Sequence, residues 1–167
     1  MTPLARISIE AQGWQALPDL EKLVGQCIAF ALEETGDALA EEAEVSLLFC
    51  DDARIRDLNK RFRGQDKPTN VLSFPGPEPI EEALALGDIA IAFETVAREA
   101  TEQNKTLEQH SRHMIVHGFL HLLGFDHEDD EEAEAMEALE IRILARQGVA
   151  NPYSEDFAQE GKTDGRA

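Results

Sequence analysis

The sequence predicts a single α+β domain. Four short apolar segments have the character of strands, and they are interspersed with longer segments whose apolar residues recur at helical spacing. The chain has 167 residues, which suits one domain with one hydrophobic core. No internal repeat and no linker-like stretch divides it. We therefore expect one domain over residues 1–153 and a polar, disordered tail over 154–167.

The first half of the chain predicts two strands and two helices. In order, they are a strand over 4–10, a helix from Pro18 to Gly36, a strand over 44–50, and a short helix from Asp51 or Asp52 to about Phe62. The first helix is predicted by apolar residues at the i, i+3, i+4, i+7 spacing, beginning at Leu20. An aspartate at the start of the second helix can cap its free N–H groups.

The second half predicts two more strands and three more helices around two loops. In order, they are a polar loop over 63–69, a strand over 70–74, a surface loop over 75–85, a strand over 86–93, and helices over 94–103, 106–124 and 131–146. Prolines mark both loops. The helix over 106–124 is apolar on nearly all sides from Met114 to Phe125, so we expect it to be central and buried.

Charge is distributed unevenly along the chain. The formal net charge is −19, which taken alone argues against a nucleic-acid partner, because binding to phosphates requires local lysine and arginine. Six of the fifteen basic residues nevertheless fall between positions 54 and 67. Eight carboxylates fall between Glu128 and Glu140, which predicts a solvated helix face there. The sequence thus predicts one basic segment on an acidic protein.

The cysteines and the apolar runs predict a cytoplasmic protein without a membrane partner. Cys27 and Cys50 do not form a CxxC motif and fall in apolar segments, so we expect buried free thiols in a reducing compartment. No apolar run approaches the roughly 20 residues of a membrane span. The N-terminus lacks the basic start and apolar core of a signal peptide.

Three histidines within eleven residues predict a metal site. His117 and His121 are four residues apart, so a helix carries both on one face, one turn apart. Gly124 can end that helix in a left-handed conformation and turn the chain back, which brings His127 to the same point. Three neutral imidazoles suit zinc and leave a fourth position open for water. We therefore predict one catalytic Zn²⁺ per chain rather than three satisfied core histidines.

The same spacing, H-x-x-x-H-x-x-G-x-x-H, is that of the metzincin proteases, with one difference. Those enzymes carry a glutamate directly after the first histidine, as the general base for the zinc-bound water, whereas this chain has Gly118. A peptidase built on this motif would lack its base. Gly118 is also expected to leave room beside the metal for another backbone or a bulky substrate.

Four segments together resemble the YbeY family of bacterial endoribonucleases, also called rRNA maturation factors. They are the run HGFLHLLGFDH over 117–127, the run RGQDKPTNVLSFP over 63–75, the run LGDI over 86–89, and the closing segment over 136–153. The chain carries Phe125 and Gln65 where other members have Tyr and Lys, and neither position is a metal ligand. The resemblance covers about residues 45–153, in the family's order.

The resemblance implies a fold and an activity. The fold is a single zincin-like domain with a mixed four-stranded sheet, surrounding helices and a central, buried metal-binding helix. The activity is that of a zinc-dependent endoribonuclease that prefers single-stranded RNA. It acts in 3′-end maturation of small-subunit ribosomal RNA and in ribosome quality control. Implied partners are ribosomal RNA and, further, small ribosomal subunit proteins or an assembly GTPase. Two alternatives stay open, namely a metzincin-like peptidase and a zinc-stabilised, non-enzymatic ribosome-assembly factor.

The resemblance also implies catalytic roles for two residues. His117, His121 and His127 become the zinc ligands, with His117 counted among the catalytic residues, and Arg63 becomes the basic residue at the RNA site. Arg63 lies in the basic segment, and its planar guanidinium matches a phosphate.

Further residues are candidates for support of the ligands or for substrate contact. They are Asp126, Asp88, Asn70, Ser73 and Lys67. Asp126 could orient a ligand imidazole or cap the turn after Gly124. Asp88 is a turn residue or reaches the site from a strand end, and Asn70 and Ser73 contact substrate or serve packing. His113 continues the face of His117, but we expect a core or solvated histidine rather than a fourth ligand.

Overall fold

A mixed four-stranded sheet forms the centre of the structure, a computed structural model that describes residues 2–154. Its strands are β1 (Leu4–Ile9), β2 (Glu44–Cys50), β3 (Val71–Pro75) and β4 (Ala85–Ala92), in the spatial order β1-β2-β4-β3. β1, β2 and β4 run parallel, and β3 pairs antiparallel with β4. The predicted α+β class and mixed sheet are confirmed. Most of the predicted tail lies outside the described residues.

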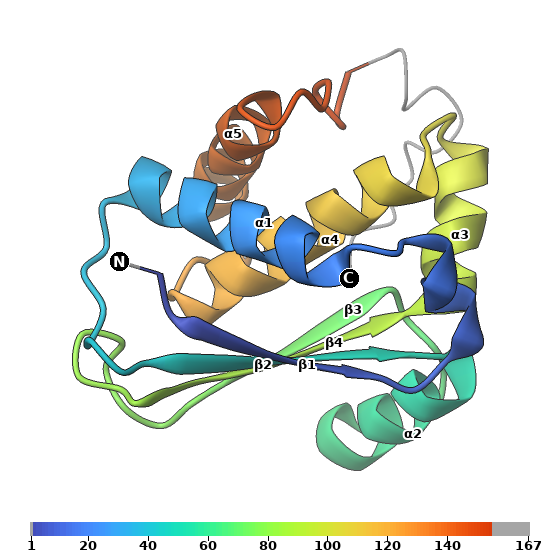
Figure 1. The fold of residues 1–167 in the computed structure, drawn as a ribbon, viewed down its shortest axis with the longest axis horizontal. Coiled ribbons are helices and arrows are strands. Elements are labelled where there is room, and N and C mark those ends of the chain that lie inside the picture. Colours follow the sequence, from blue (N-terminus) through green and yellow to red (C-terminus); the bar gives the residue numbers. More distant parts are fainter. Residues whose placement is uncertain (1, 155–167) are drawn as a thin grey trace.

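Helices cover both faces of the sheet, unequally (Figure 1). They are the 3-10 helix η1 (Gln12–Ala16) and the α-helices α1 (Leu20–Thr35), α2 (Asp52–Arg63), α3 (Phe93–Glu102), α4 (Leu107–Leu122) and α5 (Asp130–Ala145). α1, α4 and α5 lie on one side of the sheet and α2 lies alone on the other. None of the helices in the described part of the chain has the length and hydropathy needed to cross a bilayer.

Local sequence signals account for most of the boundaries. The Asp51 side chain accepts a hydrogen bond from the Arg54 N–H and so caps α2, as the sequence suggested. α1 ends at Gly36, whose φ of 75° is left-handed and therefore favours glycine. The short η1 was not predicted, because it contains no apolar periodicity. It is held by Trp14, which is buried against Phe49 and donates its indole N–H to the carbonyl of Cys50.

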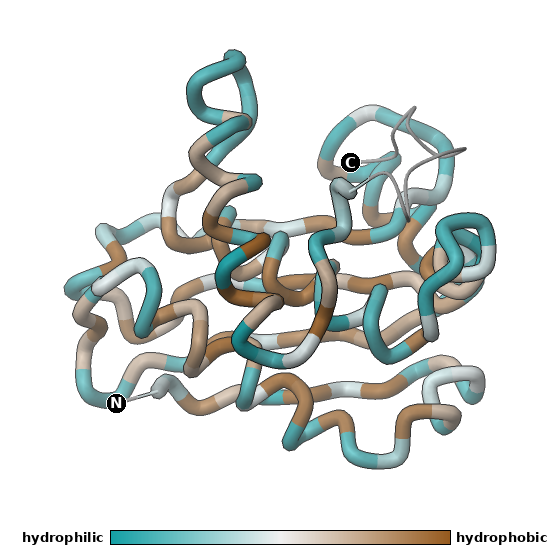
Figure 2. Tube along the Cα trace, turned by 90° about the horizontal axis from the view of Figure 1, so that it is seen from above, coloured by the Kyte–Doolittle hydropathy of each residue, from teal (hydrophilic) through white to brown (hydrophobic). Residues whose placement is uncertain are grey.

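α4 is the central helix, as predicted. It packs against α1, α3 and α5 and, on its other side, against β3 and β4. From Met114 to Leu120 every residue is buried. Apolar positions gather in the sheet and the helices stacked on it, and hydrophilic positions gather in the outer loops (Figure 2). A helix enclosed in this way is a stiff base for any side chains it presents at its end.

The edge strand β3 carries two different faces. Val71 belongs to the main core beneath α4, whereas Leu72 packs with the smaller apolar cluster on the α2 face. Because side chains alternate along a strand, Ser73 faces α4 and Phe74 faces α2. The end of α2 adjoins this edge, because Arg63 lines a pocket with Ser73 and Phe62 lines a pocket with Phe74.

Both cysteines are buried free thiols, as expected. Burial raises the pKa of Cys27 and of Cys50 to about 12. Neither thiol is therefore a reactive nucleophile at neutral pH.

Candidate metal centre

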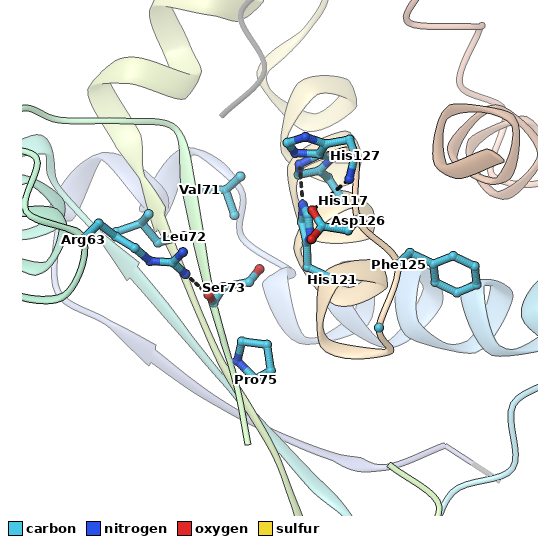
Figure 3. A pocket seen from close by; sticks show the side chains of 11 residues that line it. Arg63, Val71, Leu72, Ser73, Pro75, His117, His121, Phe125, Asp126 and His127 are labelled. Atoms are coloured by element: carbon cyan, nitrogen blue, oxygen red, sulfur yellow. Dashed lines mark hydrogen bonds between the residues drawn. The ribbon is translucent and has the colours of Figure 1, made fainter. Parts of the chain in front are cut away.

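The end of α4 and the turn after it bring the three motif histidines together. His117 and His121 lie one turn apart, and Gly124, with a φ of 107°, lets the chain reverse toward His127. One ring nitrogen of each histidine lies within 4.8 Å of the other two. His117 is buried, His121 half-buried and His127 exposed, so the cluster opens to solvent on one side (Figure 3).

The donor set and its spacing fit a zinc ion. The Nε2 atoms of His117 and His121 are 3.2 Å apart. Two nitrogen ligands at about 2.0–2.1 Å from a tetrahedral zinc would be about 3.4 Å apart. Burial and the neighbouring His117 and His127 lower the pKa of His121 to about 4. His121 is therefore neutral at physiological pH, as a metal ligand must be.

A buried carboxylate, Glu140 of α5, fixes the orientation of His117. Its Oε2 accepts a hydrogen bond from Nδ1 of His117 at 2.6 Å, which leaves Nε2 of that ring unprotonated and turned toward the cluster. Glu140 is fully buried. Burial opposes its ionisation, but hydrogen bonds from His113 and His117 outweigh that effect and hold the pKa of Glu140 well below its usual range.

The burial of Glu140 contradicts part of the prediction made for the acidic run. The expectation of a solvated helix face over Glu128–Glu140 is wrong for its last member, because α5 turns that face toward α4. Met136 and Ile143, one turn before and after, are buried as well, and so is the adjacent Leu139. Residue 140 thus falls in the apolar stripe of α5. A carboxylate in such a stripe was the available signal for a functional residue.

We expect Glu140→Gln to weaken metal binding by about 10- to 100-fold, the usual cost of losing a carboxylate that supports a histidine ligand. The amide keeps the volume of the side chain but removes the charge that favours the Nδ1-protonated form of His117. Competition with a chromogenic chelator measures the affinity. Glu134→Gln, on the exposed side of the same helix, is the control and should bind metal like the wild type. Equal affinities for both variants would contradict a role of Glu140.

The other oxygen of Glu140 holds His113. Oε1 accepts hydrogen bonds from Nε2 of His113 at 2.9 Å and from the hydroxyl of Tyr153. Nδ1 of His113 is buried and has no hydrogen-bond partner among residues 2–154, so a second proton there would have no acceptor in that part of the chain. Burial lowers the pKa of His113 to about 4. His113 is therefore a neutral core residue, directed away from the three clustered histidines.

This neutral His113 predicts a loss of stability in acid. Its pKa in the folded protein, about 4, lies below the 6.5 of an ordinary histidine. Its contribution is therefore complete above about pH 6.5 and is lost as the pH falls toward 4, on the order of 3 kcal/mol in total. We expect His113→Gln to flatten this slope in metal-free protein, as measured by urea unfolding at several pH values. Parallel pH profiles for wild type and variant would contradict the assignment.

Asn70 belongs to a second cluster of buried, hydrogen-bonded polar side chains. The Asn70 amide donates to the carboxylate of Glu99 on α3, and its Oδ1 accepts from the N–H of Val71 at the start of β3. The same carboxylate binds Nε2 of His110 at 2.8 Å. Asn70 is 3% exposed and does not line the pocket beside the histidines. Its position thus favours packing over substrate contact.

The histidines and Arg63 line one pocket of about 480 Å³. Arg63, at the end of α2, lies across the pocket from the histidines, with the edge strand β3 between α2 and α4 (Figure 3). Its Nη2 donates to the carbonyl oxygen of Ser73 at 2.6 Å. A guanidinium has five N–H donors, so this bond leaves others for a phosphate. Ser73 lines the same pocket.

Gly118 lets α4 approach the sheet closely. A Cβ at this position would lie 2.8 Å from a methyl carbon of Ile89 and 3.1 Å from the hydroxyl of Ser73. That hydroxyl also donates to the Gly118 carbonyl at 2.9 Å. The expected room for another backbone is thus filled by β3 and β4, and the expected room for a bulky substrate does not exist. A glutamate base at this position would not fit.

The remaining candidates are divided between the pocket and other surfaces. Asp126 lines the pocket, and its Oδ1 accepts from the backbone N–H of the next residue, His127, at 2.8 Å. The structure does not bring Asp88 to the histidines. Asp88 is exposed on the α2 face of β4, in a separate pocket, because Ile89 and Ile91 occupy the core face. Lys67 is exposed and does not line the pocket.

Comparisons with known proteins match nearly the whole chain. A family model described as "Endoribonuclease YbeY" matches residues 7–148. The Endoribonuclease YbeY of Methylocella silvestris is 51% identical over 158 residues, which are 95% of this chain and 90% of that protein. The protein of the same name from Bradyrhizobium diazoefficiens is 48% identical over 159 residues, 92% of this chain and 86% of that protein.

A solved structure has a similar fold. The solution structure of the Thermotoga maritima protein TM1509 matches with a TM-score of 0.59 and 29% identity, covering 96% of this chain and 93% of that one. The likeness therefore covers nearly the whole of both chains.

Proposed function

Because the chain belongs to the endoribonuclease YbeY family, we propose that it is a zinc-dependent endoribonuclease that prefers single strands. The observation that carries this proposal is the single pocket lined by the histidine cluster on one side and Arg63 on the other. A phosphodiester held there would face both. A pocket between β3 and the end of α4 suits a flexible single strand better than a rigid duplex.

The chain's own residues hold and orient the reacting phosphate. A zinc ion held by His117, His121 and His127 would supply Lewis-acid stabilisation of the negative charge that develops on phosphate oxygens. Arg63 binds those oxygens through its planar donor fork. Glu140 fixes the ring of His117 from behind. Within the described part of the chain, Asp126 is the only carboxylate that lines the pocket, which makes it the candidate for moving a proton.

The lack of a base at position 118 predicts ribonuclease activity without peptidase activity. An amide nitrogen leaves only when it is protonated, and zinc peptidases use a carboxylate for that transfer. RNA carries its own 2′-hydroxyl and releases an oxygen that needs less help. Unstructured protein and single-stranded RNA should be assayed side by side, with and without chelator. We expect chelator-sensitive cleavage of RNA alone. Peptide cleavage that disappears in His121→Ala would overturn the proposal.

Asp126 and Asp19 provide a matched pair for the proton-transfer step. We expect Asp126→Asn to lower kcat for RNA cleavage, because the amide cannot accept a proton, and to leave the metal content unchanged. Asp19→Asn is the control and should leave kcat unchanged, because Asp19 is exposed at the start of α1 and lines neither the histidine pocket nor the pocket on the α2 face. An unchanged kcat in Asp126→Asn would assign that residue to the turn alone.

We further propose that the RNA substrate is ribosomal. The cleavage would serve two processes in the cytoplasm, namely 3′-end maturation of small-subunit ribosomal RNA and quality control of the ribosome. Small ribosomal subunit proteins or an assembly GTPase would then deliver the substrate. Support comes from the family and from the four sequence runs that this chain shares with it over residues 45–153. The negative net charge of −19 favours such help, because the RNA meets only a local basic surface.

A further inference from the structure

A large aromatic side chain is exposed at the end of α2, next to Arg63. Phe62 is 61% exposed, the most of the large exposed hydrophobic side chains in the described part of the chain. One exposed apolar residue is ordinary on a protein surface. The surroundings of Phe62 are not, because cations and another aromatic ring are arranged around it.

Phe62 and Phe74 form a contiguous row with two arginines. The guanidinium carbon of Arg61 lies 5.6 Å from the centroid of the Phe62 ring. The Phe62 and Phe74 rings meet edge to face, with centroids 5.5 Å apart. The guanidinium carbon of Arg63 lies 5.3 Å from the Phe74 centroid. Aromatic faces beside guanidinium groups are the combination that proteins use to bind single-stranded nucleic acid.

This row continues from the metal pocket to a second pocket. Arg63 lines the metal pocket on the α4 side of β3. Phe62 and Phe74 line a more apolar pocket of about 530 Å³ on the α2 side of the same strand. β3 is the edge strand of the sheet, so a chain can cross from one pocket to the other over its outer side. A nucleotide matches these two pockets, because it joins a phosphate to a flat base with apolar faces through a sugar.

The charges around the two pockets determine which part of a bound nucleotide lies in each. Asp88 lines this pocket, and its carboxylate disfavours a phosphate there. Arg63 faces the metal pocket and favours a phosphate on that side. A bound strand therefore places its phosphate beside the histidines and its base against the phenylalanines.

We propose that Phe62 and Phe74 bind an unpaired nucleobase of the RNA strand next to the phosphate that is cut. This inference rests on the proposed ribonuclease function and adds a requirement, namely that the substrate must present an unstacked base beside the cleavage position. A protein partner is the competing occupant of the exposed ring. Arg61 and Arg63 favour RNA, because guanidinium groups add to the affinity for a polyanion. Arg61 also lies 3.6 Å from Asp57, and this exposed ion pair leaves donors of its guanidinium for a phosphate.

The test combines a protein variant with removal of a base from the RNA. Single-stranded RNA is prepared intact and with one abasic nucleotide at successive positions around the mapped cut, and kcat/KM is measured for metal-loaded protein. We expect one abasic position to lower kcat/KM of the wild type about 5- to 100-fold, the range for loss of one base–aromatic stack. Phe62→Ala should lower it similarly on intact RNA and be insensitive to the abasic nucleotide at that position.

Two further variants separate stacking from general damage. Phe62→Trp should restore the wild-type value, because it keeps an aromatic face. Leu84→Ala removes a side chain that is 60% exposed on another surface and should cut like the wild type. If Phe62→Ala cuts RNA like the wild type, with the same abasic profile, the inference is overturned while the ribonuclease function stands. If the wild type does not cut RNA, both are overturned.

Discussion

Replacing His121 by alanine is expected to remove the metal from the protein and leave the fold intact. His121 supplies one of three ligand nitrogens, and the two that remain do not make a tetrahedral site for zinc. Its side chain is only half-buried at the rim of the pocket, so its removal leaves the core unchanged. Metal analysis after dialysis should fall from about one ion per chain to near zero, with the circular dichroism spectrum preserved.

The control for this loss is a histidine of the same helix. His113→Gln removes an imidazole that binds the opposite oxygen of Glu140 and does not join the cluster. It should therefore keep most of its metal. If alanine at position 117, 121 or 127 leaves the metal content unchanged in all three single variants, the ligand assignment is wrong.

Arg63→Ala is expected to lower kcat for RNA cleavage by about 10²- to 10³-fold, the cost of removing one donor that stabilises developing charge. Metal content and folding should be unaffected, since the Arg63 side chain is exposed. Arg63→Lys should recover only part of the rate, because an ammonium group lacks the planar fork that matches a phosphate. Arg56→Ala is the control. Arg56 lies on the same helix but pairs with Asp66, 2.8 Å away.

Salt provides a second readout for the same residue. Each phosphate contact releases condensed counterions, so RNA affinity should fall steeply as salt is added. The slope of log affinity against log salt should be shallower for Arg63→Ala than for the wild type. A salt-insensitive affinity, or normal cleavage by Arg63→Ala, would exclude this surface as the RNA site.

The fold was largely predictable because its elements carry strong local signals. The apolar stripe from Leu20 to Leu32 and the left-handed Gly36 define α1, and the run EVSLLFC defines β2 to the residue. The 3-10 turn at Trp14 has no such signal. It exists because a buried tryptophan needs an acceptor for its N–H, and that acceptor, the Cys50 carbonyl, is far away in sequence.

The candidate site was predictable where spacing along one helix determines position. His117 and His121 needed only the helical repeat, and His127 needed only a turn at Gly124. Glu140 and Gly118 depend on how α4 packs against α5 and against the sheet, which local sequence does not encode. The position of Asp88 was also predictable from the sequence. Ile89 and Ile91 on the core face imply, by alternation, that Asp88 lies on the other face.

We propose that this chain cuts RNA by means of a metal held by the three histidines and facing Arg63 across one pocket. The most direct measurement incubates metal-loaded wild type and His121→Ala with the same structured ribosomal RNA precursor and maps the new ends. We predict new ends at defined single-stranded positions with the wild type, abolished by chelator, restored by zinc and absent with His121→Ala. The same ends produced by His121→Ala, or by the wild type in excess chelator, would contradict the claim.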